Sequence, residues 1–265
     1  MPIVVVASAK GGVGKTTIAA NLAVAFRSMG WEVLAVDLDP QNSLHLHFGL
    51  DLQEQGLGPS LMSKSDWRTA LKDAPHGIQI LPFGMMPERH LALTERLFRR
   101  RASEFVDYLG DLAKRPDHMV VVDTSPGQSS YCEKVLDVAD LKLTVLLADA
   151  ASFAVSGMHE EVVEERRAAG GRPLFGHYVI NQYYPNRQLS RDVHAVFEQR
   201  FGKSNVNRVH VDQGVADALA YRQTVLFHDP RCRATQDILS LALAVDRLVD
   251  PHGEKTGASA GEVVR

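Results

Sequence analysis

The strongest chemical signal in the sequence is a glycine-rich loop that ends in lysine and threonine, Lys10-Gly11-Gly12-Val13-Gly14-Lys15-Thr16-Thr17. A phosphate-binding loop needs glycines so that backbone N–H groups can approach phosphate oxygens, a lysine for the outer phosphates and a hydroxyl for Mg²⁺. Gly14, Lys15 and Thr16 supply the last three parts of the usual pattern, whereas Ala9 replaces its first glycine and Lys10 adds a second lysine. The loop predicts a polyphosphate and Mg²⁺ site, and its flanking strand and helix disfavour the alternative of an incidental glycine-rich turn.

Three aspartates follow strand-like runs, at the strand ends where an open α/β sheet carries its ligand. Asp37 and Asp39 lie in the string Asp-Leu-Asp-Pro-Gln, and side chains at i and i+2 leave a strand in the same direction. Asp123 ends the apolar run that begins at Met119. An aspartate in that position is expected to act on Mg²⁺, usually through water. For Asp37 and Asp39 the alternative is a solvated strand end followed by a turn.

The elements that must position these residues alternate between β-branched runs and helical periodicity. Strands are predicted at 3–8, 32–38, 78–82, 119–123, 142–148, 174–181 and 206–211. Helices are predicted from Lys15 to Gly30 and at 89–114, 130–139, 154–169, 189–200, 213–221 and 233–249. Such alternation predicts an α/β fold with a doubly wound, mostly parallel sheet and helices on both faces. We expect one domain over 1–250 and a disordered tail over 251–265, where no apolar pattern remains.

Composition excludes several other classes of protein. The 265 residues are 45% hydrophobic and 23% charged, which is typical of a globular chain rather than a disordered or fibrous one. The net charge of −3 argues against a dedicated nucleic-acid binder. Two cysteines make no disulfide framework, no run is long enough to span a membrane, and the N-terminus lacks a signal-peptide pattern. We therefore expect a cytoplasmic protein.

The loop with its second lysine resembles the deviant P-loop of the MinD/ParA family of dimerising ATPases. The string around Asp39 is similar to that family's first switch, and Asp123-Thr124-Ser125-Pro126-Gly127 to its second. The resemblance covers about 1–250 and implies ATP and Mg²⁺ as ligands, with Lys10, Lys15 and Asp39 as catalytic residues. It further implies that Lys10 reaches the partner's nucleotide in an ATP-bound homodimer and that Asp39 orients the attacking water. Thr16, Asp37 and Asp123 would lie at the metal.

The same resemblance assigns two residues to the base of the nucleotide. An asparagine at the place of Asn181 reads the adenine edge in that family, since an amide both donates and accepts. The alternative is an asparagine that serves only a turn. His210 lies where the family's adenine loop commonly has proline, within Arg208-Val209-His210-Val211-Asp212. The expected ATP contacts are therefore residues 10–17, Asn181 and His210.

Smaller strings narrow the resemblance to the BcsQ (YhjQ) family of cellulose-operon ATPases. Among them are Leu46-His47-Phe48-Gly49-Leu50-Asp51, Leu81-Pro82-Phe83-Gly84 and Ala148-Asp149-Ala150. The resemblance implies a nucleotide switch for assembly or placement of the cellulose synthase complex, with BcsR and BcsE as partners. Protein partners would recruit it to the inner membrane or cell pole. The alternatives are a ParA-type ATPase that partitions DNA by nonspecific binding and a nucleotide-dependent scaffold with negligible turnover, against which the intact catalytic carboxylates argue.

Three further groups of residues suggest other chemistry. Cys132 follows the second switch, but Cys232 is too distant in sequence to favour an iron–sulfur cluster. His45 and His47 lack further ligands at metal-binding spacing, which favours structural roles. The basic cluster Arg96–Arg101 fits a solvated helix face, with nucleic acid, anionic lipid or an acidic partner as the alternatives.

Overall fold

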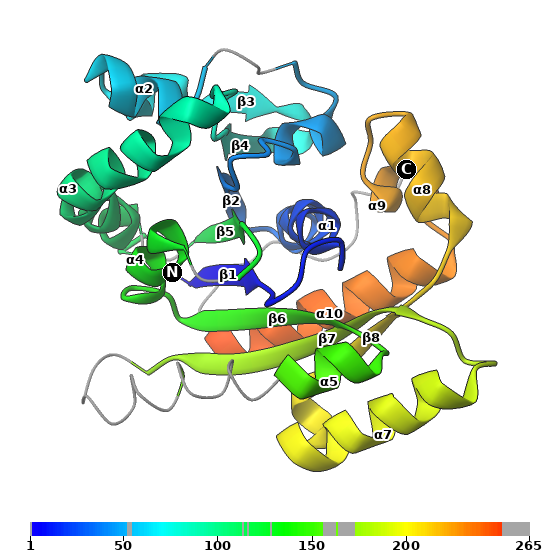
Figure 1. Ribbon diagram of the computed structural model, residues 1–265. Coiled ribbons are helices and arrows are strands. Elements are labelled where there is room, and N and C mark those ends of the chain that lie inside the picture. The colour runs from blue at the N-terminus through cyan, green and yellow to red at the C-terminus, as the bar shows by residue number, and fades with distance from the viewer. Residues whose placement is uncertain are drawn as a thin grey trace.

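A computed structural model describes residues 2–51, 55–112, 114–115, 117–127, 129–155, 163 and 173–250. Its centre is a sheet in the order β3-β4-β2-β5-β1-β6-β7-β8 (Figure 1). The strands are β1 (Ile3–Ala7), β2 (Glu32–Leu38), β3 (Lys72–Ala74), β4 (Ile78–Leu81), β5 (His118–Thr124), β6 (Leu141–Leu147), β7 (Phe175–Tyr183) and β8 (Val206–His210). All neighbours are parallel except β3 and β4. The predicted mostly parallel sheet is confirmed.

Helices cover both faces of this sheet (Figure 1). They are α1 (Lys15–Ser28), α2 (Leu57–Ser63), α3 (Glu88–Leu112), α4 (Ser130–Leu136), α5 (Ala150–Val155), α7 (Gln188–Phe201), α8 (Gln213–Ala220), α9 (Val225–His228) and α10 (Arg233–Val249). Short 3₁₀ turns are η1 (Leu44–Phe48), η2 (Trp67–Ala70), η3 (Pro75–Gly77) and η4 (Lys203–Asn205). No helix in the described part of the chain is long and apolar enough to cross a bilayer.

Successive side chains of β1 point to opposite faces of the sheet, so the core forms two layers on either side of this strand. Val4 and Val6 point into a cluster with α1 and α10, whereas Ile3 and Val5 point into a cluster with α2, α3 and α4. Side chains of β1 are buried on both faces, as a central parallel strand requires. The loop that follows β1 therefore leaves the middle of the sheet, between the ends of β5 and β6.

Differences from the predicted elements lie mainly in one region. In residues 51–76 the sequence predicts only a short helical piece near Trp67, which the structure contains as η2. The structure adds α2 and the antiparallel strand β3 there. Most of the helix predicted at 154–169 lies outside the described residues, as does the tail 251–265. The other predicted helices and strands are present, with ends shifted by a few residues.

Candidate functional site

The loop between β1 and α1 has the open backbone that phosphate binding requires. Gly12 and Gly14 have φ of 73° and 90°, which only glycine adopts without strain. The Ser8 hydroxyl donates to the Lys10 carbonyl at 2.6 Å, and the Gly127 N–H donates to the Ser8 carbonyl at 2.9 Å. The first turn of α1 carries no acidic residue. Its N-terminal N–H groups are thus available to an anion.

Glycine is also required at position 14 because Asn181 on β7 lies too close to leave room for a side chain. A Cβ atom at Gly14 would lie 2.3 Å from Nδ2 of Asn181. That nitrogen donates to the Val13 carbonyl at 2.8 Å in a buried hydrogen bond. Asn181 therefore supports the phosphate loop, a role that the sequence did not predict. Its contact with adenine stays a prediction.

Asp37, at the end of β2, shapes the loop that follows it. Its two carboxylate oxygens accept from the backbone N–H groups of Asp39 at 2.9 Å and Leu44 at 3.0 Å. The side chain is fully buried, and burial, followed by the charge of Asp123, raises its pKa well above the usual value. Both oxygens of Asp37 thus have backbone partners, and its contact with a metal stays a prediction.

Asp123, opposite Asp37 in the register of β5 and β2, is buried without such partners. Neither carboxylate oxygen has a hydrogen bond of normal geometry within the described structure. Burial raises the pKa of Asp123 to about 7, although the nearby Thr16 hydroxyl and the Lys15 charge oppose the rise. An orphaned carboxylate of this kind lacks a cation or a strong donor.

These residues fit Mg²⁺, which prefers oxygen ligands and keeps several waters. Thr16 offers a hydroxyl and Asp123 an unpaired carboxylate. The described residues contain no cluster of three acidic, histidine or cysteine side chains that could hold a metal alone. Mg²⁺ would therefore be held by these few side chains together with water and phosphate oxygens.

Asp39 lies just after β2, in a loop that hydrogen bonds connect to a neighbouring loop. Its side chain is buried, with Oδ1 accepting from the Gln41 N–H at 3.0 Å. The Asp39 carbonyl accepts from the Asn42 N–H at 2.8 Å, and Asn42 Oδ1 accepts from the Gly84 N–H at 2.9 Å. The position of Asp39 thus depends on the loop after β4, which the sequence did not reveal.

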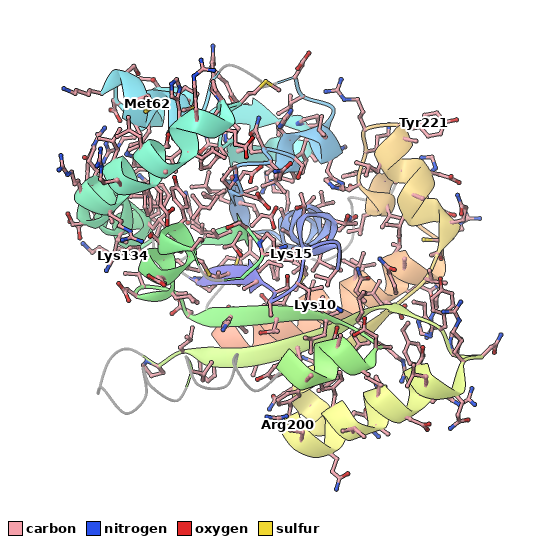
Figure 2. The ribbon with its side chains drawn as sticks, viewed as in Figure 1. Lys10, Lys15, Met62, Lys134, Arg200 and Tyr221 are labelled. Carbon is pink, nitrogen blue, oxygen red and sulfur yellow. The ribbon has the colours of Figure 1, made fainter. Side chains whose placement is uncertain are left out.

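The two lysines of the loop have different surroundings (Figure 2). Lys15 is buried on α1, where its charge acts on Asp123. Lys10 is about one-third exposed, and its Nζ lies 3.1 Å from Oδ2 of Asp149, after β6. Oδ1 of Asp149 accepts from the Ser152 N–H at 2.6 Å. Lys10 therefore has a partner within its own chain.

His210 lies on the other side of β1 from the three aspartates, at the end of β8. Its Nδ1 is 2.6 Å from Oδ2 of Asp237 on α10, and its backbone N–H donates to the same oxygen at 3.0 Å. Asp237 was missed by the sequence analysis because it lies mid-helix, 27 residues away. The contact of His210 with adenine stays a prediction.

The two cysteines, His47 and the arginine cluster, for which the sequence favours structural roles, lie outside the phosphate loop. Both cysteines are free thiols, Cys132 buried on α4 and Cys232 at the start of α10. His47 is buried on η1, and burial lowers its pKa to about 4. In the arginine cluster, Arg99 contacts Glu95 at 3.6 Å and Arg101 contacts Glu104 at 3.1 Å, while Arg96 and Arg100 are exposed.

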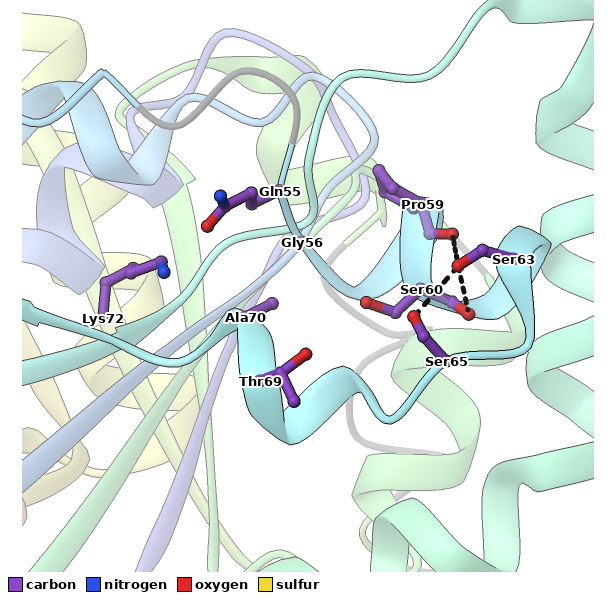
Figure 3. Close-up of a pocket in the computed structure, with 9 residues that line it drawn as sticks. All are labelled: Gln55, Gly56, Pro59, Ser60, Ser63, Ser65, Thr69, Ala70 and Lys72. Carbon is purple, nitrogen blue, oxygen red and sulfur yellow. Dashed lines mark hydrogen bonds between the residues drawn. The ribbon is translucent and has the colours of Figure 1, made fainter.

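A cavity of about 430 Å³ lies away from the phosphate loop, beside α2 (Figure 3). Several hydroxyl groups line it, from Ser60, Ser63, Ser65 and Thr69. Ser63 Oγ donates to the Pro59 carbonyl at 2.9 Å and lies 2.9 Å from Ser65 Oγ. The predicted site residues do not line this cavity.

Comparison with known proteins decides between families that share this loop. The family model described as "Cellulose biosynthesis protein BcsQ" matches residues 1–245, which include every predicted site residue. The chain belongs to the BcsQ family. A BcsQ of Escherichia coli K12 is 27% identical over 235 residues, covering 88% of this chain and 89% of that one. The family resemblance predicted from the motifs is thereby confirmed.

Relatives outside the BcsQ family share the same fold. The chromosome partitioning protein ParA of Caulobacter vibrioides is 28% identical over 257 residues, covering 92% of this chain and 93% of that one. MinD of Pyrococcus horikoshii, solved with Mg-ADP, matches with a TM-score of 0.72 at 20% identity. That match covers 96% of this chain and 99% of the MinD chain. The predicted MinD/ParA-like fold is confirmed.

Proposed function

We propose that this protein is a Mg²⁺-dependent ATPase that acts as a nucleotide switch in bacterial cellulose synthesis and secretion. The observation that carries the ATPase part is Asp123, whose orphaned carboxylate is buried beside Lys15 and Thr16 at the phosphate loop. The cellulose part rests on membership of the BcsQ family. The MinD relative solved with Mg-ADP supports the choice of ligands.

Each side chain of the site has a role that follows from its chemistry. Backbone N–H groups of residues 11–16 and the Lys15 ammonium bind the phosphates. Asp39 accepts a hydrogen bond from the attacking water and aligns it with the terminal phosphate, because phosphoryl transfer depends mainly on positioning and on charge stabilisation. Thr16 and Asp123 would hold Mg²⁺, which would neutralise charge on the phosphates.

The switch is an ATP-bound homodimer in which Lys10 contacts the nucleotide of the partner. Two polyphosphates brought together repel each other, and a cation from each subunit offsets that repulsion. The partial exposure of Lys10 supports this role, because its ammonium needs only to leave Asp149 to meet a second molecule. The composite surface of the dimer then binds partners that the monomer does not bind.

The proposed partners are proteins of the cellulose operon, with BcsR and BcsE as first candidates. They would bring this cytoplasmic ATPase to the inner membrane or the cell pole. The second candidate function is DNA partitioning, which the similarity to ParA of Caulobacter vibrioides favours. The net charge of −3 and the ion pairs within the arginine cluster weigh against it.

One pair of measurements separates the two functions. With Mg·ATP at about 150 mM salt, where exposed charges are strongly screened, we expect the protein to bind DNA weakly or not at all. Co-expression with cellulose-operon proteins is expected to yield a complex on purification. Micromolar or tighter DNA binding that ATP strengthens, without co-purification, would favour the partitioning function.

A further inference from the structure

The cavity beside α2 has a polar lining that the proposed catalysis does not use (Figure 3). Its volume of about 430 Å³ lies within the range of small-molecule sites. The described residues that line it supply hydroxyl groups, one amide and one ammonium group, but no aromatic ring and no carboxylate. Such a lining offers hydrogen bonds to a polar ligand and no stacking surface to a flat apolar one.

Ser60 on α2 places a hydroxyl group without a protein partner in this cavity. The residue is only 7% exposed. No hydrogen bond in the described part of the chain engages its Oγ, and this atom is not among the fully enclosed polar atoms. Figure 3 shows the hydroxyl directed into the cavity. A buried hydroxyl that lacks a protein partner favours a ligand that hydrogen-bonds to it.

Lys72, at the start of β3, supplies the cationic group of the cavity. Its ammonium group and the amide of Gln55 point toward the same space (Figure 3). Within the described residues Lys72 has no ion pair, so its charge is available to a ligand. Thr69 Oγ1 donates to the Asp66 carbonyl at 2.7 Å, which leaves the lone pairs of this hydroxyl as acceptors.

These groups together fit a ligand that combines a phosphate with several hydroxyl groups. The phosphate would pair with the Lys72 ammonium in charge-assisted hydrogen bonds. The ligand's hydroxyl groups would donate to Thr69 and exchange hydrogen bonds with Ser60, since a hydroxyl both donates and accepts. A cation is disfavoured because no described residue of the lining is acidic.

One wall of the cavity packs against the loop after β4. A Cβ atom at Gly56 would lie 2.4 Å from the carbonyl oxygen of Phe83, and one at Gly84 would lie 2.7 Å from Cδ of Pro59. The Gly58 N–H donates to the Phe83 carbonyl at 2.8 Å. Packing this close prevents the wall from moving independently of that loop.

The loop after β4 is in turn hydrogen-bonded to the loop that carries Asp39. The Gly84 N–H donates to Asn42 Oδ1 at 2.9 Å, and the Asn42 N–H donates to the Asp39 carbonyl at 2.8 Å. A ligand that orders the wall of the cavity would therefore act on the position of Asp39. Coupling of this kind is reciprocal, so ATP and the ligand would change each other's affinity by the same factor.

We propose that the cavity beside α2 is a regulatory site for a small phosphorylated sugar, and that its occupancy changes the affinity for ATP. The binding of the sugar phosphate stands on the lining of the cavity alone. The coupling rests on the proposed ATP site and on the contacts of Gly84 and Asn42.

Titration calorimetry of the nucleotide-free full chain with glucose 6-phosphate tests the binding. We expect a Kd of about 1 mM or tighter, with glucose at least about ten-fold weaker because it lacks the phosphate. Lys72→Met should lower the affinity at least about ten-fold, and Ser60→Ala about three- to ten-fold. Lys134→Met, which removes an exposed lysine of α4, is the matched control and should bind normally.

Two further titrations distinguish this cavity from the phosphate loop. Lys15→Ala should keep the affinity for glucose 6-phosphate, because Lys15 does not line the cavity. Inorganic phosphate should bind at least about five-fold more weakly than glucose 6-phosphate, because it cannot reach the hydroxyl groups along the cavity. Circular dichroism checks that Lys72→Met folds, and Ser60→Ala supplies the test if it does not.

Titration of Mg·ATP into protein saturated with glucose 6-phosphate tests the coupling. The Kd for ATP should change at least about five-fold relative to the sugar-free protein. Asn42→Gly removes the amide that contacts Gly84 and tolerates the φ of 48° at this position. This variant should bind glucose 6-phosphate normally and lose most of the change.

Three results would overturn the site: no binding of glucose 6-phosphate at millimolar concentration, unchanged affinity in folded Lys72→Met, or loss of binding in Lys15→Ala. An ATP affinity that saturation with the sugar phosphate leaves unchanged would overturn the coupling. Failure of the protein to bind ATP at all would contradict the ATP site and the coupling with it, whereas the sugar-phosphate titration would still decide the binding.

Discussion

The two ends of the proposed nucleotide site differ in how many hydrogen-bond partners their buried carboxyl group has. At the phosphate end, Asp123 is buried with no hydrogen-bond partner among the described residues, and its pKa is raised to about 7. At the base end, Asp237 is also buried, though less completely, but it receives N–H donors from His210 and lies beside Arg233. The phosphate end is therefore incomplete without a ligand, whereas the base end is preorganised by its own chain.

The largest expected effect is on hydrolysis at the phosphate end. Asp39→Ala should lower the ATPase rate by about 10²- to 10⁴-fold while leaving a dimer that forms with ATP and persists. Lys10→Ala should bind ATP as a monomer but fail to dimerise or hydrolyse. Phosphate release and size exclusion with light scattering measure the two properties. Normal dimerisation and turnover by Lys10→Ala would show that this lysine has no role across the interface.

The next largest effect is expected on the affinity for Mg·ATP when the buried Lys15 is replaced. Lys15→Ala loses a charged hydrogen-bonding partner of the phosphates, so Mg·ATP should bind more weakly by at least ~2–3 kcal/mol, roughly 30- to 160-fold. Calorimetric titration measures the affinity. Lys134→Ala, which removes an exposed lysine on α4, is the matched control and should bind normally. Equal ATP affinity in both variants would refute the phosphate site.

Replacing Asp123 or Asp237 by asparagine should change the free energy of unfolding in opposite directions. Asp123→Asn removes a buried carboxyl group whose ionisation burial opposes, so the nucleotide-free protein should gain about 2 kcal/mol of unfolding free energy at pH 7 while Mg²⁺-dependent ATP binding falls. Asp237→Asn weakens satisfied contacts and should lose about 1–2 kcal/mol. Urea denaturation without ligand measures both. A loss of stability in Asp123→Asn would mean that its carboxylate already has a partner.

The smallest expected effect concerns His47, which follows the first switch. Burial lowers its pKa to about 4 in the folded protein from 6.5, so the unfolded chain binds a proton first as pH falls. Its contribution to stability is therefore complete above pH ~6.5 and is lost toward pH ~4. Between pH 7 and pH 5 the loss from this group should be about 1.5 kcal/mol.

Urea denaturation of His47→Gln at both pH values isolates that contribution. The variant should lose less stability than the wild-type protein on acidification. Identical pH dependence in His47→Gln and wild type would show that His47 is protonated equally in both states.

Prediction from sequence succeeded where the signal is local. The glycines, Lys15 and Thr16 lie within one turn of each other, and a strand before and a helix after them are visible in the same stretch of chain. Asp39 became a candidate because it follows a buried strand of a parallel sheet, and Asp123 because it lies near the end of another; their roles stay predictions. In residues 51–76 only the short helical piece near Trp67 was predicted, because α2 and β3 are short and neither has a periodic pattern that distinguishes it from a loop.

The sequence by itself determined the fold class, the phosphate loop and the set of candidate carboxylates, because residue type and periodicity act over a few neighbouring positions. Only the tertiary structure decided which of those residues have partners. Asp123 is orphaned, whereas Lys10 pairs with Asp149 across 139 positions of sequence and Asn181 reaches Val13 across 168. Such pairings depend on the order of strands in the sheet, which brings distant loops to one edge and which no local pattern encodes.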